Sequence, residues 1–388
     1  MTPIHRPSIA ANRVTSPLAG LGSVLAALSL VLAACSGPAN GTGPAASSSP
    51  GTTFATEPSG VAASPAASLA TPGPQGSLKL GYFPNITHAT AIVGVESGIF
   101  ARDLGPGVTF ETATFNAGSS AIEALLNGAV DATYIGPNPA INGYAKSGGA
   151  ALRIIAGATS GGAFLVVKPS IKTVDQLKGT KLATPQLGNT QDVALRTWLL
   201  DHGLKTDAQG GGDVSILPQD NAQTLETFSS GGIDGAWVPE PWATRLVQEG
   251  GGTVLVDERT LWPGGQYVTT QLIVRTDYLA AHADIVSALL AGDLEANALV
   301  NDDPARARQL TNQGIEKITG KQLNTAVIEA AWPNLTFTPD PIASSLKTSA
   351  DHAVAVGLLQ PVDLSGIYDL GPLNALLKAA GQREVSGL

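Results

Sequence analysis

The sequence predicts an α/β protein made of two related lobes, with the chain crossing from one lobe to the other twice. After residue 77, short apolar stretches typical of strands alternate with stretches of helical periodicity. One helix–strand pattern also occurs twice along the chain. The length of 388 residues, with 43% hydrophobic and 14% charged residues, is enough for two lobes that each bury a core.

The first 35 residues resemble a lipoprotein signal. Arg6 and Arg13 precede an apolar stretch from Leu18 to Ala34, and Leu32-Ala33-Ala34-Cys35 resembles a bacterial lipobox. We therefore expect a lipid on Cys35 that anchors the protein to the extracytoplasmic face of the cell membrane. A transmembrane anchor and an ordinary secretory signal with an incidental Cys are the alternatives. The stretch is shorter than the about 20 apolar residues that a span needs.

Residues 36–76 consist almost entirely of Ala, Gly, Ser, Thr and Pro. Such a segment has too little apolar bulk to offset the entropy of ordering it. It predicts a flexible tether between the membrane and the folded part.

Composition excludes several function classes. The balance of 22 Lys+Arg against 31 Asp+Glu, without a basic cluster, argues against a nucleic-acid partner. A single Cys and scattered His residues give no internal disulfide and no zinc pattern. The sequence contains no Gly-x-Ser-x-Gly elbow, no His-Glu-x-x-His and no P-loop. We expect no cofactor, no metal and no catalytic residue, and a monomer.

The folded part begins near Ser77. Residues 78–82 alternate like a strand and lead into a Pro/Asn-rich loop at 83–88. A helical stretch at 89–100 and a strand at 108–114 follow.

The internal repeat is the most informative feature. Residues 121–135 and 224–238 each predict a helix, a Gly stop, a tight turn and a short buried strand, followed by a Pro-rich loop. Such units are common in α/β proteins, but matches at one constant offset favour two related lobes. The matched pairs are Glu123 and Glu226, Gly128 and Gly231, Asp131 and Asp234, and Tyr134 and Trp237.

The repeat and its flanking strands set the expected lobe boundaries. Strand 269–274 is expected to pair with strand 163–167, so the chain would cross between lobes near 171 and near 265. Two crossings form a hinge on which a cleft can close. Helical stretches after 276 are expected to pack on the first lobe. The boundaries are then 77–171 plus 266–388 for lobe 1 and 172–265 for lobe 2.

Ligands of open α/β sheets bind at the loops that follow the carboxyl ends of the strands. Two of these loops precede helices, 116–120 and 185–192, and the first helical N–H groups there are free to bind a small oxyanion. Ser120 and Glu123 form a capping-box pattern at the first of them. The candidate ligand-binding residues are Phe83, Asn85, Thr87, His88, Asn116, Gly118, Ser119, Ser120, Asn138, Gln186, Asn189, Thr190, Gln191, Trp237, Glu240 and Trp242.

These loops carry no Lys or Arg, and His88 is their single basic residue. Neutral dipoles would hold the ligand, which favours a monoanion over a phosphate. Donors at contact distance outweigh the net charge of −9 because distant charges are screened within about 8–10 Å.

Individual roles stay open. Glu240 is either a partner for a cationic or hydroxyl group of the ligand, or an acceptor for hinge amides or Arg245. Trp237 and Trp242 could stack on the ligand, or Trp237 could lie in the core. Phe83 is expected in the pocket wall, and His88 equally fits a helix cap.

Five motifs together resemble the nitrate/taurine/aliphatic-sulfonate family of ABC substrate-binding proteins, over nearly all of residues 77 to about 300. They are Gly81-Tyr82-Phe83-Pro84-Asn85, Phe115-Asn116-Ala117-Gly118-Ser119, Tyr134-Ile135-Gly136-Pro137-Asn138-Pro139, Ala183-Thr184-Pro185-Gln186-Leu187-Gly188-Asn189-Thr190 and Trp237-Val238-Pro239-Glu240-Pro241-Trp242. The resemblance implies a type II periplasmic-binding-protein fold, with a membrane permease and its ATPase as partners. Sulfonate-like members are nearest, and the lack of a cleft Lys speaks against nitrate.

The leading hypothesis is therefore a solute-binding lipoprotein for a small organic anion, most closely an aliphatic sulfonate or taurine-like compound. An extracellular enzyme on the same scaffold and a ligand sensor that docks on a membrane kinase are the alternatives.

Overall fold

The computed structural model describes residues 73–388. The expected signal sequence with Cys35, and the tether as far as residue 72, lie outside the described residues. Strand β1 begins at Gly76, one residue before the expected start of the folded part. Among residues 73–388, no helix is both long and apolar enough to cross a membrane.

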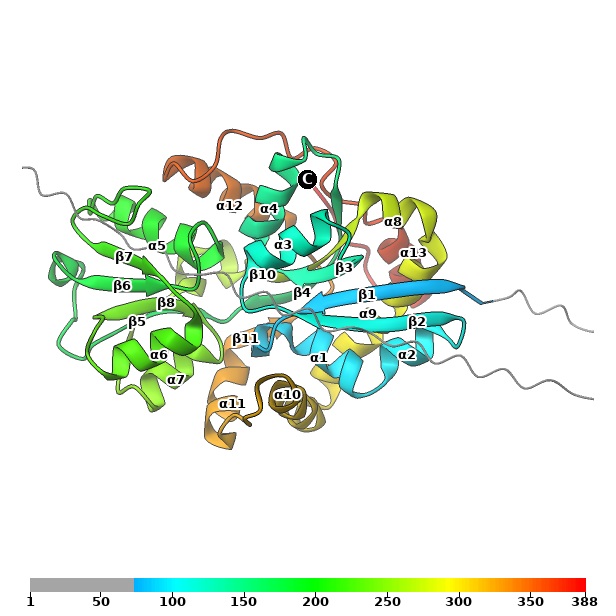
Figure 1. Ribbon diagram of the computed structural model, residues 1–388, viewed down its shortest axis with the longest axis horizontal. Helices are drawn as coiled ribbons and strands as arrows, with labels where there is room; N and C mark the ends of the chain where they lie inside the picture. The colour runs from blue at the N-terminus through cyan, green and yellow to red at the C-terminus, as the bar shows by residue number, and fades with distance from the viewer. Residues whose placement is uncertain (1–72) are drawn as a thin grey trace, which may run out of the picture. The chain divides into compact units, whose positions relative to one another are not determined.

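Within the described residues the strands form two sheets, one of six strands and one of five (Figure 1). The first sheet contains β1 (Gly76–Tyr82), β2 (Val108–Thr114), β3 (Ala132–Ile135), β4 (Leu152–Gly161), β10 (Val268–Arg275) and β11 (Leu335–Phe337). The second contains β5 (Ala163–Val167), β6 (Lys181–Thr184), β7 (Ser215–Pro218), β8 (Gly235–Pro239) and β9 (Thr253–Asp257). The prediction of an α/β protein with two lobes is confirmed.

The two sheets repeat one topology. Their strand orders are β2-β1-β3-β10-β4-β11 and β7-β6-β8-β5-β9. In each sheet the first three strands are parallel, and the fourth, β10 or β5, runs antiparallel to the third. The parallel strands therefore point their carboxyl ends to one edge of each sheet, and the loops that follow them meet there.

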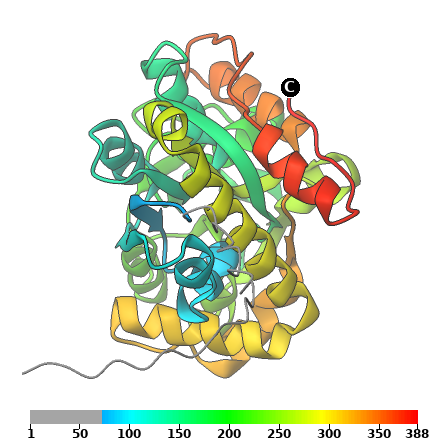
Figure 2. The same ribbon diagram turned by 90° about the vertical axis from the view of Figure 1, so that its right-hand side faces the viewer.

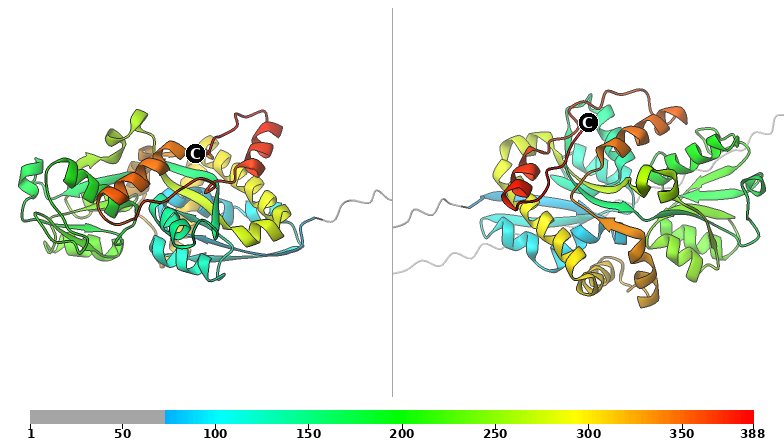
Figure 3. Two further views of the ribbon diagram at one scale, coloured as in Figure 1. Left: turned by 90° about the horizontal axis from the view of Figure 1, so that it is seen from above. Right: turned by 180° about the vertical axis from the view of Figure 1, so that it is seen from behind.

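Helices cover both faces of each sheet (Figures 1, 2 and 3). One face of the first sheet packs mainly on α1 (Ala89–Glu96), α2 (Ile99–Leu104), α9 (Ala283–Asp302), α10 (Pro304–Thr319) and α13 (Gly371–Ala379). The other face packs on α3 (Gly118–Leu126), α4 (Pro137–Lys146) and α12 (Ala343–Ala355). The second sheet lies between α5 (Thr190–Asp201) and the pair α6 (Asn221–Ser229) and α7 (Trp242–Gln248). Helices α8 (Thr276–Ala281) and α11 (Thr325–Ala331) complete the set.

The alternation of side chains along the strands explains this layering. On β10, Leu272 and Val274 pack on the α9 face, while Ile273 packs on the α3 face. Successive side chains of a strand point to opposite faces, so a strand apolar at every position needs a helix layer on each side.

The internal repeat corresponds to matching structure. Asp131 and Asp234 each follow a Gly with positive φ, Gly128 (71°) and Gly231 (80°). The carboxylate of Asp131 accepts the N–H of Lys79 at 2.9 Å, and that of Asp234 accepts the N–H of Lys181 at the same distance. Each aspartate thus connects the turn before β3 or β8 to the neighbouring parallel strand, β1 or β6.

The first crossing between lobes differs from the expectation. Strand β5 pairs with β8 and β9, and β10 pairs with β3 and β4, so the expected pairing of 163–167 with 269–274 is wrong. The chain passes from β4 to β5 at Gly161 and Gly162 instead of near 171. Both glycines have positive φ, 79° and 76°, which lets the chain leave one sheet and enter the next within two residues. The second crossing lies between β9 and β10, which includes the expected position near 265.

The C-terminal segment does more than pack on the first lobe. It also adds β11 to the first sheet, and it contacts the second lobe through α12 against α5 and α11 against α7.

Candidate functional site

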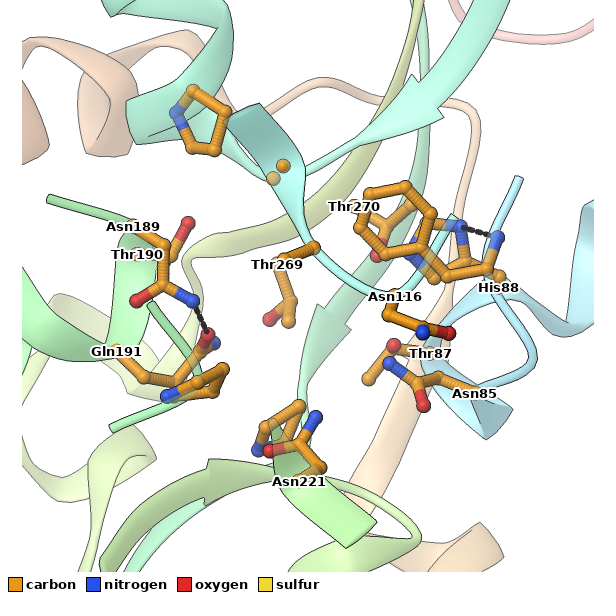
Figure 4. Close-up of a pocket in the computed structure, with 17 residues that line it drawn as sticks. Asn85, Thr87, His88, Asn116, Asn189, Thr190, Gln191, Asn221, Thr269 and Thr270 are labelled. Carbon is orange, nitrogen blue, oxygen red and sulfur yellow. Dashed lines mark hydrogen bonds between the residues drawn. The ribbon is translucent and has the colours of Figure 1, made fainter. Parts of the chain in front are cut away.

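A small cavity lies where the carboxyl-end loops of the two sheets meet (Figure 4). Its volume is about 40 Å³, and we call it the central cavity. It is lined by Phe83, Asn85, Thr87, His88, Asn116, Ala117, Gly118, Gly136, Pro139, Pro185, Asn189, Thr190, Gln191, Asn221, Pro239, Thr269 and Thr270.

The loop after β1 supplies the first wall. Phe83 and His88 stack with their ring centroids 4.5 Å apart, and the N–H of Phe83 donates to Nδ1 of His88 at 3.4 Å. Burial lowers the pKa of His88 to about 3, so its ring is neutral at physiological pH. A neutral ring whose Nδ1 accepts a hydrogen bond carries its proton on Nε2 and can donate from there.

Helices α3 and α4 begin at the second wall. Gly118, the first residue of α3, leaves room for Pro139, because a Cβ there would lie 2.2 Å from Cγ of Pro139. Gly136, just before α4, faces the other lobe, and a Cβ there would lie 2.6 Å from Oγ1 of Thr190. Both helix N-termini can therefore approach the cavity closely. Helix α3 brings N–H groups that are unused inside the helix, whereas Pro137 and Pro139 at the start of α4 have no N–H to donate.

The second lobe contributes the N-terminus of α5. Asn189 caps the helix by accepting the N–H of Asp192 at 2.9 Å, which leaves Thr190 and Gln191 at the cavity. The carboxylate of Asp192 is fully buried and accepts hydrogen bonds from Thr184 Oγ1 and from Arg196 Nε, each at 2.9 Å. This ion pair neutralises the acid next to the site.

Thr269, Thr270 and Asn221 also line the cavity, and the sequence analysis missed them. Thr270 is 1% exposed, and its Oγ1 has no hydrogen-bond partner within the described residues; the same holds for Oδ1 of Asn221, which is 8% exposed. Unpartnered polar atoms in a buried site are costly unless a ligand or water satisfies them. Thr269 and Thr270 belong to the returning strand β10, so a correct strand order would have pointed to them.

Of the described residues that line the central cavity, none is Lys, Arg, Asp or Glu. The lining combines hydroxyls, amides, one neutral imidazole and the N-termini of α3, α4 and α5. Such a site can solvate a small anion with neutral donors.

Four of the predicted residues lie near the cavity without lining it. Gln186 accepts the N–H of Ser119 at 3.1 Å, which joins the two lobes beside the cavity. Ser120 donates to the carbonyl of Ala117 at 2.9 Å. The expected capping box is therefore wrong: α3 begins at Gly118 with Ala117 as its N-cap, so Ser120 already lies in the first turn. Asn138 points away and donates to the carbonyl of Ser349 at 3.1 Å.

Trp237 and Glu240 are structural in this fold. Trp237 is fully buried and donates through Nε1 to Glu258 at 2.7 Å, so of its two interpretations the core position applies. Glu240 is 1% exposed and accepts from the N–H of Thr244 and from Nδ2 of Asn334. Burial raises the pKa of Glu240, and Arg245 pairs with Glu249 instead.

Trp242 lies at the edge of the cavity. Its Nε1 donates to Oδ1 of Asn85 at 3.0 Å, across the cleft between the lobes. A further bond across the cleft runs from Nδ2 of Asn142 to the carbonyl of Gly188 at 3.3 Å. These contacts hold the lobes closed over the central cavity.

Two solved structures share this fold, so the chain has a periplasmic-binding-protein fold. The alkanesulfonate-binding protein SsuA from Xanthomonas axonopodis pv. citri, solved bound to MOPS, matches with a TM-score of 0.64 and 20% identity, over 78% of this chain and 100% of that protein. The periplasmic nitrate-binding protein NrtA from Synechocystis PCC 6803 matches with a TM-score of 0.64 and 17% identity, over 79% and 90%.

The sequence places the chain more narrowly. The NMT1-like family matches residues 71–313, more than half of the chain, and the chain belongs to that family. The taurine-binding periplasmic protein of Escherichia coli (strain K12) is 26% identical over 209 residues, which cover 53% of this chain. The match spans 61% of that relative, less than two thirds of its length.

Proposed function

We propose that the protein is an extracytoplasmic solute-binding lipoprotein of an ABC importer, and that it binds a small organic anion such as an aliphatic sulfonate or a taurine-like compound. The central cavity carries the proposal, because buried neutral donors and the N-termini of α3 and α5 converge on it. The permease and ATPase of the importer are the proposed partners. The similarity to proteins that bind taurine and alkanesulfonates supports the ligand class.

The donor set favours a sulfonate. A sulfonate presents three oxygens that share one negative charge, and it stays ionised at every physiological pH. Donors from both lobes can satisfy these oxygens at once, which couples binding to closure of the cleft. The single titratable side chain in the lining, His88, is neutral, so we propose binding without catalysis.

A ligand screen tests the proposal. Thermal unfolding of the purified protein is followed with taurine, alkanesulfonates, nitrate, sulfate and aromatic carboxylates, and calorimetry then measures the affinity of each hit. A ligand at 100 times its Kd stabilises the folded protein by about 2.7 kcal/mol. We expect a sulfonate to stabilise the protein and nitrate to have no effect. No shift with any sulfonate, or turnover of a compound, contradicts the proposal.

The variant Thr270→Val tests the site itself. Valine removes the unpartnered hydroxyl at nearly constant volume, so the folded protein should not lose stability. Loss of a hydrogen bond to an anion costs about 1.5–3 kcal/mol, so Kd should rise about tenfold or more. Thr311→Val is the matched control, because Thr311 Oγ1 is equally buried and unpartnered but lies in α10, outside the lining. Equal affinities in the two variants contradict the assignment of the site.

The lipid anchor needs its own test. Labelling cells with a tagged fatty acid should mark the protein, and Cys35→Ser should abolish both the label and the membrane association.

A further inference from the structure

A second and larger cavity adjoins the central one. Its volume is about 460 Å³, and we call it the outer cavity. It shares Asn85, Asn116 and Asn221 with the central cavity, so these three asparagines form the boundary between the two spaces. Figure 4 shows Asn85 and Asn116 near each other at the right and Asn221 at the bottom.

Apolar side chains from both lobes form part of the walls of the outer cavity, among polar and charged side chains. Leu225 comes from α6 of the second lobe, and Ile315 and Leu323 come from α10 and the segment that follows it. Pro84 and Pro241 extend the apolar surface. The charged residues Asp220, Glu226 and Lys321 are exposed to solvent.

Trp242 is held rigidly in this wall. The guanidinium carbon of Arg245 lies 4.6 Å from the centre of the Trp242 ring, and Arg245 is in turn paired with Glu249 at 2.9 Å. The indole Nε1 is bonded to Asn85 on the boundary. An aromatic surface fixed on both sides loses little conformational entropy when a ligand packs on it.

The sizes of the two spaces differ by about tenfold. A volume of about 40 Å³ suits an anionic headgroup, whereas the outer cavity lies in the range of sites for drug-sized molecules. Nitrate would leave the outer cavity unused.

We infer that the ligand is an organic anion with an apolar tail of several carbons, with its headgroup in the central cavity and its tail in the outer cavity beside Trp242. This inference rests on the proposed function and narrows the ligand class. It favours longer alkanesulfonates over taurine, whose two-carbon chain is too short to fill the outer cavity.

A homologous series of ligands tests the inference. Calorimetry on the purified protein compares methanesulfonate, butanesulfonate and hexanesulfonate. Burial of one methylene contributes up to about 0.8 kcal/mol, so each added carbon should lower Kd about two- to fourfold. If methanesulfonate binds but chain length has no effect, the two-cavity inference fails while the proposed function stands. If no sulfonate binds, both fail.

Filling the outer cavity provides the second arm. Leu225→Trp or Leu323→Trp should abolish the gain from chain length and leave the Kd of methanesulfonate unchanged within twofold. The control is Leu200→Trp, which alters an exposed leucine of α5 outside both linings. Circular dichroism and thermal unfolding identify a variant that misfolds, and the other filling variant then decides the result. The inference is overturned if Leu225→Trp or Leu323→Trp folds correctly and its affinity still rises with the chain length of the sulfonate.

Discussion

In the proposed anion site, His88 would contribute without carrying a positive charge. Its Nδ1 is occupied by the N–H of Phe83, and burial keeps its pKa at about 3. The ring therefore acts as a fixed neutral donor. A protonated imidazole would be stronger, but it would also make affinity depend on pH in the physiological range.

Ligand affinity should accordingly be constant between pH 5 and pH 8. The sulfonate stays ionised throughout this range, and His88 stays neutral because its pKa lies well below it. Calorimetry at several pH values measures the effect directly. An affinity that rises steadily toward pH 5 would mean that the ring gains a proton when the ligand binds, contrary to this prediction.

At the residue scale, the sequence located lining residues that directly follow a strand. Asn116 and Thr190 are examples, because a strand and the helix after it fix the loop between them. It could not locate Thr270 or Asn221, since their place depends on which strand lies next to which. It left the roles of Trp237 and Glu240 open. A buried side chain whose polar group has a partner inside the protein cannot be distinguished by sequence from one that contacts a ligand.

At the scale of elements, the site depends on helices from opposite lobes approaching each other closely. Gly136 before α4 and Thr190 at the start of α5 are the point of contact. A glycine is needed there for space and not for conformation, because its φ of −71° is open to any residue.

Gly136→Ala should therefore weaken binding about tenfold with little change in thermal stability. The new methyl group would lie 2.6 Å from Oγ1 of Thr190, so the lobes must part or Thr190 must rotate out of place. Calorimetry measures the affinity. Gly371→Ala on α13 is the control, because the nearest atom to its methyl group would be 3.6 Å away. Unchanged affinity in Gly136→Ala would show that the lobes do not need this contact.

Most individual elements could be predicted from periodicity, including the strand at 108–114 and most helices of the C-terminal segment, but not α12. The strand pairing of 163–167 could not, because this strand is apolar at every position and 269–274 ends in three apolar residues, Leu272, Ile273 and Val274. Such strands fit the centre of either sheet equally well. The turn at Gly161 and Gly162 determines which sheet strand 163–167 joins. Two adjacent glycines in a sequence do not reveal the direction in which the chain turns.

At the scale of the whole described chain, two acids besides Glu240 are buried without an ion pair. Asp293 of α9 accepts the hydroxyl of Tyr134 at 2.5 Å, and Glu258, in the second crossing, accepts Nε1 of Trp237. Burial raises the pKa of each to about 7. Unfolded Asp and Glu have pKa values of about 4.

Stability should therefore fall as the pH rises from about 4 to about 7. Between these pKa values the folded state binds more protons than the unfolded state. Raising the pH therefore favours the unfolded state. Asp293→Asn keeps an acceptor for Tyr134 but cannot ionise, so its free energy of unfolding should decline less. At pH 8 it should exceed that of the wild type by more than about 1 kcal/mol.

Urea unfolding followed by tryptophan fluorescence at pH 5 to pH 8 measures this difference. Glu258→Gln should flatten the remaining dependence in the same way. Parallel curves for the wild type and Asp293→Asn would show that Asp293 is already ionised in the folded protein.

The neutral lining of the central cavity also bears on release. A ligand held by an ion pair keeps its charged partner on one lobe after the lobes separate. Such a ligand dissociates slowly. Here each lobe offers only some of the neutral hydrogen-bond donors, and the attraction of a dipole for an anion falls off within a few ångströms. Separation of the lobes alone should thus release the ligand. Added salt should hardly change the dissociation constant of the closed protein.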